Sequence, residues 1–100
     1  MSRTQSDIRN NVKVGFQEPK QYHVVFHNDD FTTMEFVVSV LKIVFRKSQA
    51  DAEAIMMKVH KEGKAIAGTY SFDIAVSKAN KATRMAREKN YPLKLTVEEA

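Results

Sequence analysis

The chain has 100 residues, enough for one domain with one hydrophobic core, and its 43% hydrophobic and 28% charged residues are typical of a globular protein. It contains no cysteine, which excludes disulfides, thiolate catalysis and cysteine-ligated metals, and no apolar run approaches the roughly 18 residues of a membrane span. The net charge of +4 raises nucleic acid as a partner, but the basic residues are dispersed and form no Lys/Arg block.

The first 20 residues are polar and lack periodicity, and Gly15 and Pro19 interrupt any regular element. We therefore predict a flexible N-terminal arm over residues 1–20 and a folded domain over residues 21–100. The missing cysteines, and the absence of a signal-peptide apolar core at the N-terminus, fit a cytoplasmic protein.

The first predicted element is a strand over residues 22–27, in which aromatic and β-branched residues alternate between two faces. Tyr22, Val24 and Phe26 lie on one face, and the other face carries His23, Val25 and His27. Two residues four positions apart in a strand are separated by roughly 13 Å, so these histidines are too distant to share an ion. No metal site is predicted.

A Thr-x-x-Glu capping box from Thr32 to Glu35 predicts a helix that begins there and ends near Arg46. Its apolar side chains spread over roughly 160° of the helix surface, although a helix packed on one side needs a stripe of only about 100°. The excess predicts that part of this surface lines something besides the core. The apolar positions are Met34, Val37, Val38, Val40, Leu41, Val44 and Phe45.

Ser48 is typical of an N-cap, and the helix that follows it is expected to reach about Glu62, where Gly63 provides the C-terminal stop. Its core face holds Ala52, Ile55, Met56 and Val59, with His60 on the flank of that face.

Residues 64–70 are predicted as a strand, and Ser71 is expected to cap a third helix with Asp73 in its first turn. The sequence Asn90-Tyr91-Pro92 ends that helix, and a final strand follows. The helix has a face of small residues that would let it lie close on a sheet: Ala75, Ala79, Ala82 and Ala86.

The element order is β-α-α-β-α-β, which predicts an α+β fold. We expect a three-stranded antiparallel sheet with three helices packed on one face, preceded by the flexible arm.

The polar run Asn28-Asp29-Asp30 stands where the first strand meets the first helix. One such residue is enough for a turn, and two adjacent carboxylates repel each other. Carboxylates beside apolar side chains can recognise an ammonium group through charge-assisted hydrogen bonds, so the run predicts a cation site. The structural alternative is a turn in which Asp30 supports the helix.

His60 has the corresponding two interpretations. A neutral imidazole can accept a hydrogen bond from an ammonium group, whereas an isolated histidine is more often a packed or surface residue. Met34 and Met56 suit an adaptable apolar pocket as well as a core.

Other functional classes receive less support from the residues. The sequence contains no glycine-rich phosphate loop and no Gly-x-Ser-x-Gly nucleophile elbow, and we predict no catalytic residue and no cofactor. A small acid-base enzyme that uses Asp29 and His60 is the catalytic alternative. A nucleic-acid module, supported by the pI and the basic third helix, is the alternative binding class.

Three stretches of the chain strongly resemble the ClpS family of adaptor proteins. The first is Tyr22-x-Val24-Val25-x-x-Asn28-Asp29-Asp30-Phe31-Thr32-x-Met34-Glu35-Phe36-Val37. The second is Ile55-Met56-x-x-Val59-His60-x-x-Gly63-Lys64-Ala65, and the third is the ending Pro92-Leu93. The pair Ala75 and Lys78 also resembles the family. The similarity covers residues 20–98. Three positions depart from the family pattern, namely Thr33, Ser39 and Val76.

The resemblance implies a non-enzymatic adaptor for N-degron substrates, which carry Leu, Phe, Tyr or Trp as the N-terminal residue. Such an adaptor delivers these substrates to a ClpA-like AAA+ unfoldase, through its N-terminal domain, for degradation by ClpP. The resemblance also implies a monomer that binds neither nucleic acid nor membrane.

The resemblance assigns roles to individual residues. Asn28, Asp29 and His60 would hold the substrate's α-amino group, with Asp30 shaping the site. Asp73 and Lys78 would dock on the unfoldase, and Met34 would act as a gate against β-branched first residues. The pocket for the substrate side chain would be lined by Thr32, Met34, Val37, Met56, Val59 and Leu93.

Overall fold

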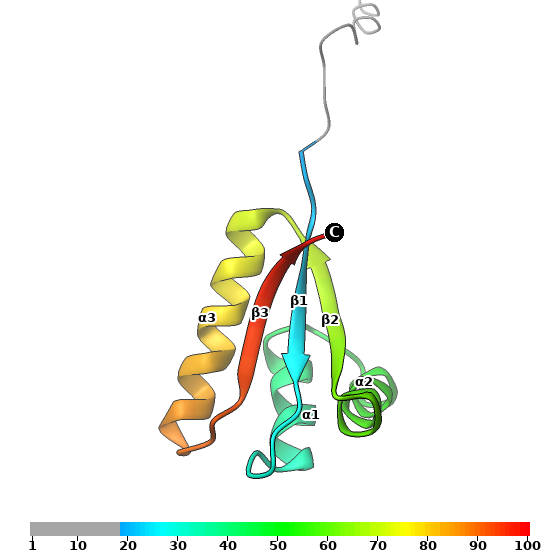
Figure 1. Cartoon of the computed structure of the whole chain (residues 1–100), viewed down its shortest axis with the longest axis vertical. Helices are drawn as coiled ribbons and strands as arrows, with labels where there is room; N and C mark the ends of the chain where they lie inside the picture. The colour runs from blue at the N-terminus through cyan, green and yellow to red at the C-terminus, as the bar shows by residue number, and fades with distance from the viewer. Residues whose placement is uncertain (1–18) are drawn as a thin grey trace, which may run out of the picture.

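The computed structural model describes residues 19–100, and the prediction of a flexible arm over residues 1–20 falls almost entirely outside them. Three strands and three helices follow one another in the predicted order (Figure 1). They are β1 (Tyr22–His27), α1 (Met34–Ile43), α2 (Gln49–Glu62), β2 (Lys64–Tyr70), α3 (Phe72–Glu88) and β3 (Lys94–Glu99).

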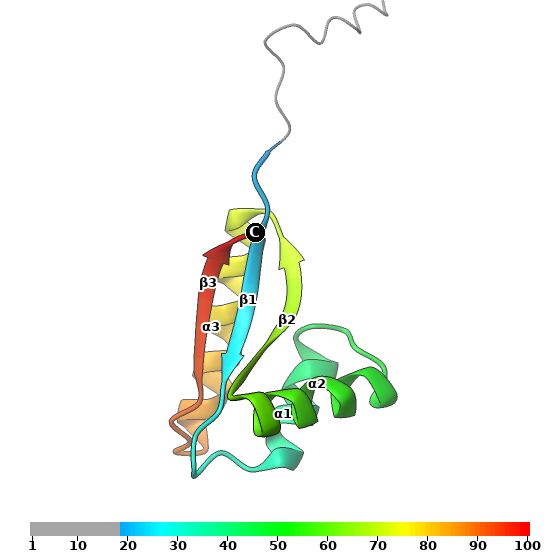
Figure 2. The ribbon, with the colours of Figure 1, turned by 45° about the vertical axis from the view of Figure 1, so that its right-hand side comes forward.

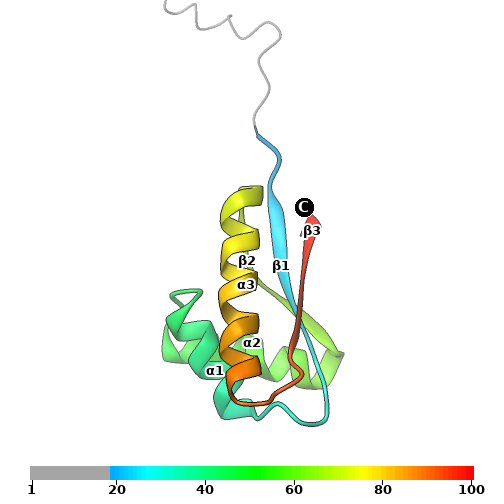
Figure 3. The same cartoon turned by 90° about the vertical axis from the view of Figure 1, so that its left-hand side faces the viewer.

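The strands form one antiparallel sheet in the order β2-β1-β3, so the first strand lies in the centre. Helices α1 and α3 lie on one face of this sheet, and α2 lies beside the end of β2, so most of the other face is open (Figure 1 and Figure 3). The predicted α+β architecture is confirmed. Among residues 19–100, no helix is both long enough and apolar enough to cross a membrane.

The core lies between the central strand and the helices. Val24 and Phe26 of β1 are fully buried, as the alternation along this strand predicted. The small-residue face of α3 is also buried, because side chains that end at Cβ allow the helix backbone to approach the sheet closely. Its members are Ala75, Ala79, Ala82 and Ala86.

Helix α1 differs from its prediction at both ends. Its N-cap is Thr33 rather than Thr32: the Thr33 hydroxyl accepts a hydrogen bond from the backbone N–H of Phe36, and the hydroxyl of Thr32 is used in the preceding loop. The helix ends at Ile43 rather than near Arg46. Arg46 has a φ of 60°, a left-handed conformation that a helix cannot continue through.

Helix α2 has the predicted caps. The Ser48 hydroxyl accepts from the backbone N–H of Asp51, and Gly63 ends the helix in the left-handed region with a φ of 92°. The chain reverses at this glycine and enters β2, which pairs with β1. This reversal places the end of α2 beside the end of the central strand (Figure 2).

Candidate functional site

A main-chain hydrogen bond joins the two segments that carry the predicted ammonium site. The backbone N–H of Asn28, just after β1, donates to the carbonyl of Gly63 over 2.9 Å, and the N–H of Gly63 donates to the carbonyl of Val59 over 2.9 Å. His60 stands one position after Val59. Asn28 and His60 are therefore brought together by the left-handed turn at Gly63, and both line the same hollow.

The hollow has a volume of about 410 Å³, within the range of ligand pockets. It lies between the loop that follows β1, the start of α1 and the end of α2. Its lining contains nine of the ten residues predicted to bind the substrate: Asn28, Asp29, Asp30, Thr32, Met34, Val37, Met56, Val59 and His60.

Asp29 holds the loop in shape. One oxygen of its carboxylate accepts from the backbone N–H groups of Phe31 over 2.8 Å and Thr32 over 2.7 Å, and the other oxygen accepts from the Thr32 hydroxyl over 2.8 Å. This pattern is an Asx turn extended by a side-chain bond. Both carboxylate oxygens of Asp29 are therefore engaged within the loop.

The charge of Asp29 is stabilised by the same contacts. Burial on its own would raise the pKa of this carboxyl, but the N–H groups of Thr32 and Phe31, the Thr32 hydroxyl and the positive charge of Arg87 together lower the pKa below its usual value. Asp29 is thus held as an anion at neutral pH.

The exposed polar residues of the hollow are Asn28, Asp30, Thr33 and His60. Among residues 19–100, the Asp30 carboxylate has neither a hydrogen bond nor an ion pair, in contrast to its neighbour Asp29. An incoming cationic group therefore finds a carboxylate with both oxygens available at Asp30.

The apolar part of the hollow has a floor and a mouth. Val37 of α1 and Val59 of α2 are buried and form the floor. Met34 is the first residue of α1 and is 44% exposed, so its flexible thioether stands at the mouth.

Leu93, the tenth predicted binding residue, is not part of this lining. It is only 1% exposed and belongs to the core, just before β3, and its carbonyl accepts from the Arg87 guanidinium over 3.0 Å. Its apolar side chain directly after Pro92 suits a core position as well as a pocket.

Two lining residues were not predicted. Phe31 and Thr33 also border the hollow, and the Phe31 ring is 75% exposed. A large aromatic side chain in a polar loop was the available signal for Phe31. Thr33 gave no such signal, because its hydroxyl serves the helix cap.

The two predicted docking residues lie apart from the hollow, on α3. Asp73 is exposed in the first turn of this helix. Lys78 is half-buried, and its amino group donates to the carbonyl of Val44 at the end of α1 over 2.8 Å. The same amino group lies 5.3 Å from the ring centroid of Tyr70, a cation–π distance. Lys78 therefore also ties α3 to α1.

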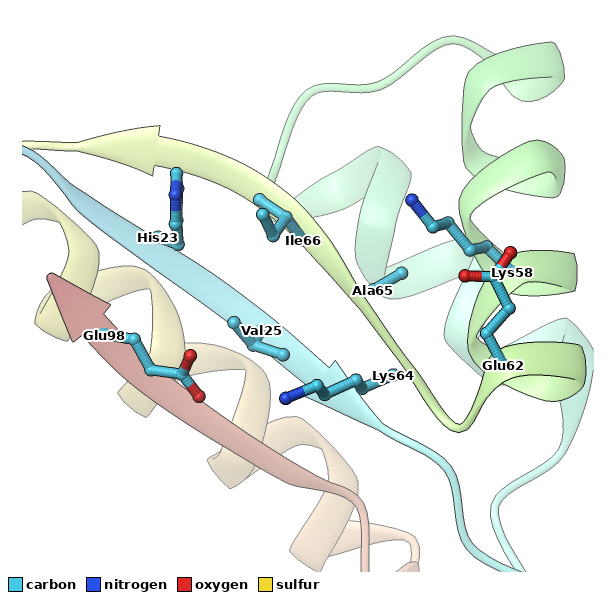
Figure 4. A pocket seen from close by; sticks show the side chains of 8 residues that line it. All are labelled: His23, Val25, Lys58, Glu62, Lys64, Ala65, Ile66 and Glu98. Atoms are coloured by element: carbon cyan, nitrogen blue, oxygen red, sulfur yellow. The ribbon is translucent and has the colours of Figure 1, made fainter. Parts of the chain in front are cut away.

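A different hollow, of about 350 Å³, lies on the open face of the sheet (Figure 4). Its charged side chains have both signs, and Figure 4 shows Lys64 and Glu98 extending toward each other over Val25. The balance of charges favours no single charged ligand. On the same face, His23 shares a 2.8 Å hydrogen bond with Thr69, and no cluster of metal-binding side chains occurs within residues 19–100.

Comparison with known proteins identifies the family. The family model described as "ATP-dependent Clp protease adaptor protein ClpS" matches residues 17–96, which is most of the chain. The chain belongs to the ClpS family.

Individual ClpS proteins are similar over most of their length. The adapter protein ClpS of Acetivibrio thermocellus is 45% identical over 91 residues, covering 91% of this chain and 92% of the relative. That of Clostridium acetobutylicum is 51% identical over 83 residues, covering 83% of this chain and 82% of the relative. Among solved structures, that of Agrobacterium tumefaciens ClpS2 bound to L-phenylalaninamide superposes with a TM-score of 0.81 at 42% identity, covering 83% of this chain and all of that one.

Proposed function

We propose that this ClpS-family chain binds proteins whose N-terminal residue is Leu, Phe, Tyr or Trp and delivers them to a ClpA-like unfoldase for degradation by ClpP. The observation that carries the proposal is the hollow in which an unengaged carboxylate, an imidazole and an apolar floor meet. The Agrobacterium relative bound to L-phenylalaninamide supports it, because that ligand combines a free α-amino group with an aromatic side chain.

The ammonium is held by Asp30, Asn28 and His60 in our proposal, and Asp29 keeps the loop in place. This exchanges the two aspartates relative to the sequence-based prediction, because both oxygens of Asp29 already accept hydrogen bonds within the loop, whereas the Asp30 carboxylate accepts none from residues 19–100. A free α-amino group has a pKa of about 7.7–8.0 and is mostly charged at neutral pH. Placing it in the hollow is favourable only when it is paired and hydrogen-bonded, which the Asp30 carboxylate and the His60 imidazole provide.

An internal or acetylated residue has no ammonium to offer these groups. Losing two charge-assisted hydrogen bonds costs about 3 kcal/mol, which is roughly a 150-fold weaker affinity. The site therefore distinguishes a free N-terminus from an internal or acetylated residue.

The side chain of the first residue occupies the apolar part, above Val37 and Val59 and against Met56 and Thr32. Met34 at the mouth narrows the entrance where the Cβ of that residue must pass, which disfavours a second branch on Cβ. We assign Leu93 a supporting position behind this pocket, since its side chain is in the core.

Delivery requires a surface that remains accessible when the substrate is bound. Asp73 and Lys78 on α3 provide it in our proposal, because neither lines the substrate hollow. The adaptor is expected to work in the cytoplasm, where the unfoldase acts, and as a monomer.

Fluorescence anisotropy with labelled peptides tests the binding step. A peptide beginning with free Phe or Leu should bind roughly 100-fold more tightly than its N-acetylated twin. Equal affinity of the two twins would refute the proposal. Degradation by the cognate unfoldase and ClpP, with and without the adaptor, tests delivery, and Asp73→Ala should reduce degradation without changing peptide affinity.

A further inference from the structure

A second, larger hollow of about 600 Å³ runs between α1 and α2, and we call it the helix groove. Met34 and Val38 line it from α1, and Met56 and Met57 line it from α2. Val38 is partly buried against the core and also lines this groove. The wide apolar surface of α1 therefore faces the helix groove as well as the core.

The helix groove is continuous with the proposed substrate site, because Met34 and Met56 line both hollows. On α1, Val37 faces the substrate site and Val38 faces the helix groove. The two methionines therefore form the boundary between the two hollows, and a ligand that leaves the first crosses it to enter the second.

The far end of the helix groove is bordered by polar side chains. The Lys42 amino group donates to the Gln49 side-chain oxygen over 2.7 Å, and the Gln49 amide nitrogen donates to the Glu53 carboxylate over 2.8 Å. This chain of hydrogen bonds connects the end of α1 to the start of α2. The helix groove thus has one end at the substrate site and one polar end.

Its length suits a short peptide segment. Met34 and Lys42 are eight positions apart on α1, which corresponds to about 12 Å at 1.5 Å per residue. An extended peptide covers about 3.3–3.6 Å per residue, so three to four residues span this distance.

We propose that the helix groove binds apolar side chains of the residues that directly follow the substrate's N-terminal residue, at positions two to four. The inference rests on the proposed function, because the N-terminal residue must first occupy the neighbouring site. The side chains that the helix groove binds are unbranched or branched aliphatic ones, because methionine side chains adapt to such shapes and carry no charge. The adaptor then selects among substrates that share the same first residue.

The experiment measures the affinity of labelled peptides that all begin with Phe. One peptide has Gly at positions two, three and four, and three others carry a single Leu at one of these positions. At least one Leu peptide should bind about three- to tenfold more tightly than the Gly peptide, as expected for partial burial of one leucine side chain.

Two variants test whether the helix groove provides this gain. Met57 is 36% exposed, so Met57→Gln keeps the side-chain length and should fold normally while making the groove wall polar. It should reduce the Leu preference to less than about twofold and leave the Gly peptide unaffected. Ile43→Gln is the matched control, because Ile43 is an exposed apolar residue of α1 outside both hollows.

The outcomes separate this inference from the proposed function. If the Gly peptide with a free N-terminus binds and its acetylated twin does not, but no Leu peptide gains affinity, the helix groove inference is wrong and the proposed function stands. An unchanged Leu preference in Met57→Gln also overturns the inference. If no free N-terminus binds at all, both proposals fail. A Met57 methyl NMR signal that shifts with the Leu peptide but not with the Gly peptide would locate the contact directly.

Discussion

Replacing the two adjacent aspartates one at a time should separate binding from loop structure. Asp30→Asn keeps the shape of the side chain and removes its charge, so a charge-assisted bond to the substrate ammonium becomes a neutral one. The net loss is about 1–2 kcal/mol, or roughly a 5- to 30-fold weaker affinity. The melting temperature should hardly change, because the carboxylate is exposed and without a partner among residues 19–100.

Asp29→Ala should behave differently. It removes the acceptor of three hydrogen bonds from Phe31 and Thr32, which at a half-exposed site amount to about 1–2 kcal/mol of stability. For a domain of this size, that corresponds to a melting temperature lower by roughly 4–16 °C.

Circular dichroism melts and peptide anisotropy on these two variants and on Asp29→Asn decide between the two roles. If Asp30→Asn binds like the wild type, or if Asp29→Asn loses binding while its loop and melting temperature stay intact, the assignment of the ammonium to Asp30 is wrong.

Three further predictions follow from the site. Met34→Ala should widen the mouth of the hollow and improve binding of peptides beginning with Ile or Val relative to Leu by about 3- to 30-fold; an unchanged ratio would remove Met34 as the gate. The pKa of Asp29 is lower in the folded than in the unfolded chain, so its carboxylate stabilises the fold above about pH 4. This contribution is lost as the pH falls through the lowered pKa. The melting temperatures of the wild type and Asp29→Asn should therefore differ at neutral pH and become equal in acid. In Gly63→Ala the added Cβ would have no atom within 4 Å, so only the backbone φ of 92° opposes the change. We expect the stability in denaturant titrations to fall by about 1–2 kcal/mol and peptide binding to weaken. A stability equal to that of the wild type would show that the left-handed turn is not needed.

The sequence predicted much of the fold because its local signals agree with one another. Ser48 and Gly63 define both ends of α2, and the alanines of α3 define its buried face. The start of α1 could not be decided in this way, since Thr32 and Thr33 are both good N-caps. The choice depends on Asp29, which engages the hydroxyl of Thr32 and leaves Thr33 to cap the helix.

The end of α1 was also beyond local signals. No glycine or proline stands there, and Arg46 is an ordinary helix former that adopts a left-handed conformation. The backbone N–H of Lys47 donates to the carbonyl of Leu41 over 3.1 Å in this turn, and Lys78 donates to Val44 from a helix 34 positions away. Such a long-range contact has no counterpart in the local pattern.

The composition of the site was more predictable than the roles within it. Nine of the ten residues that the residue types and the family resemblance predicted to bind substrate line one hollow. Asp29 and Asp30 are chemically identical neighbours, however, and only the direction of each side chain distinguishes them. Leu93 shows the same limit, because an apolar residue can face a pocket or the core without any change in the sequence pattern.

The bond between the Asn28 N–H and the Gly63 carbonyl has a consequence for how this protein can vary. It belongs to the main chain, so among single replacements at position 28 only proline removes its donor. The two halves of the recognition site are therefore assembled independently of the side chains that line it. Those side chains can diversify during evolution, and be altered by engineers, while the frame that presents them is retained.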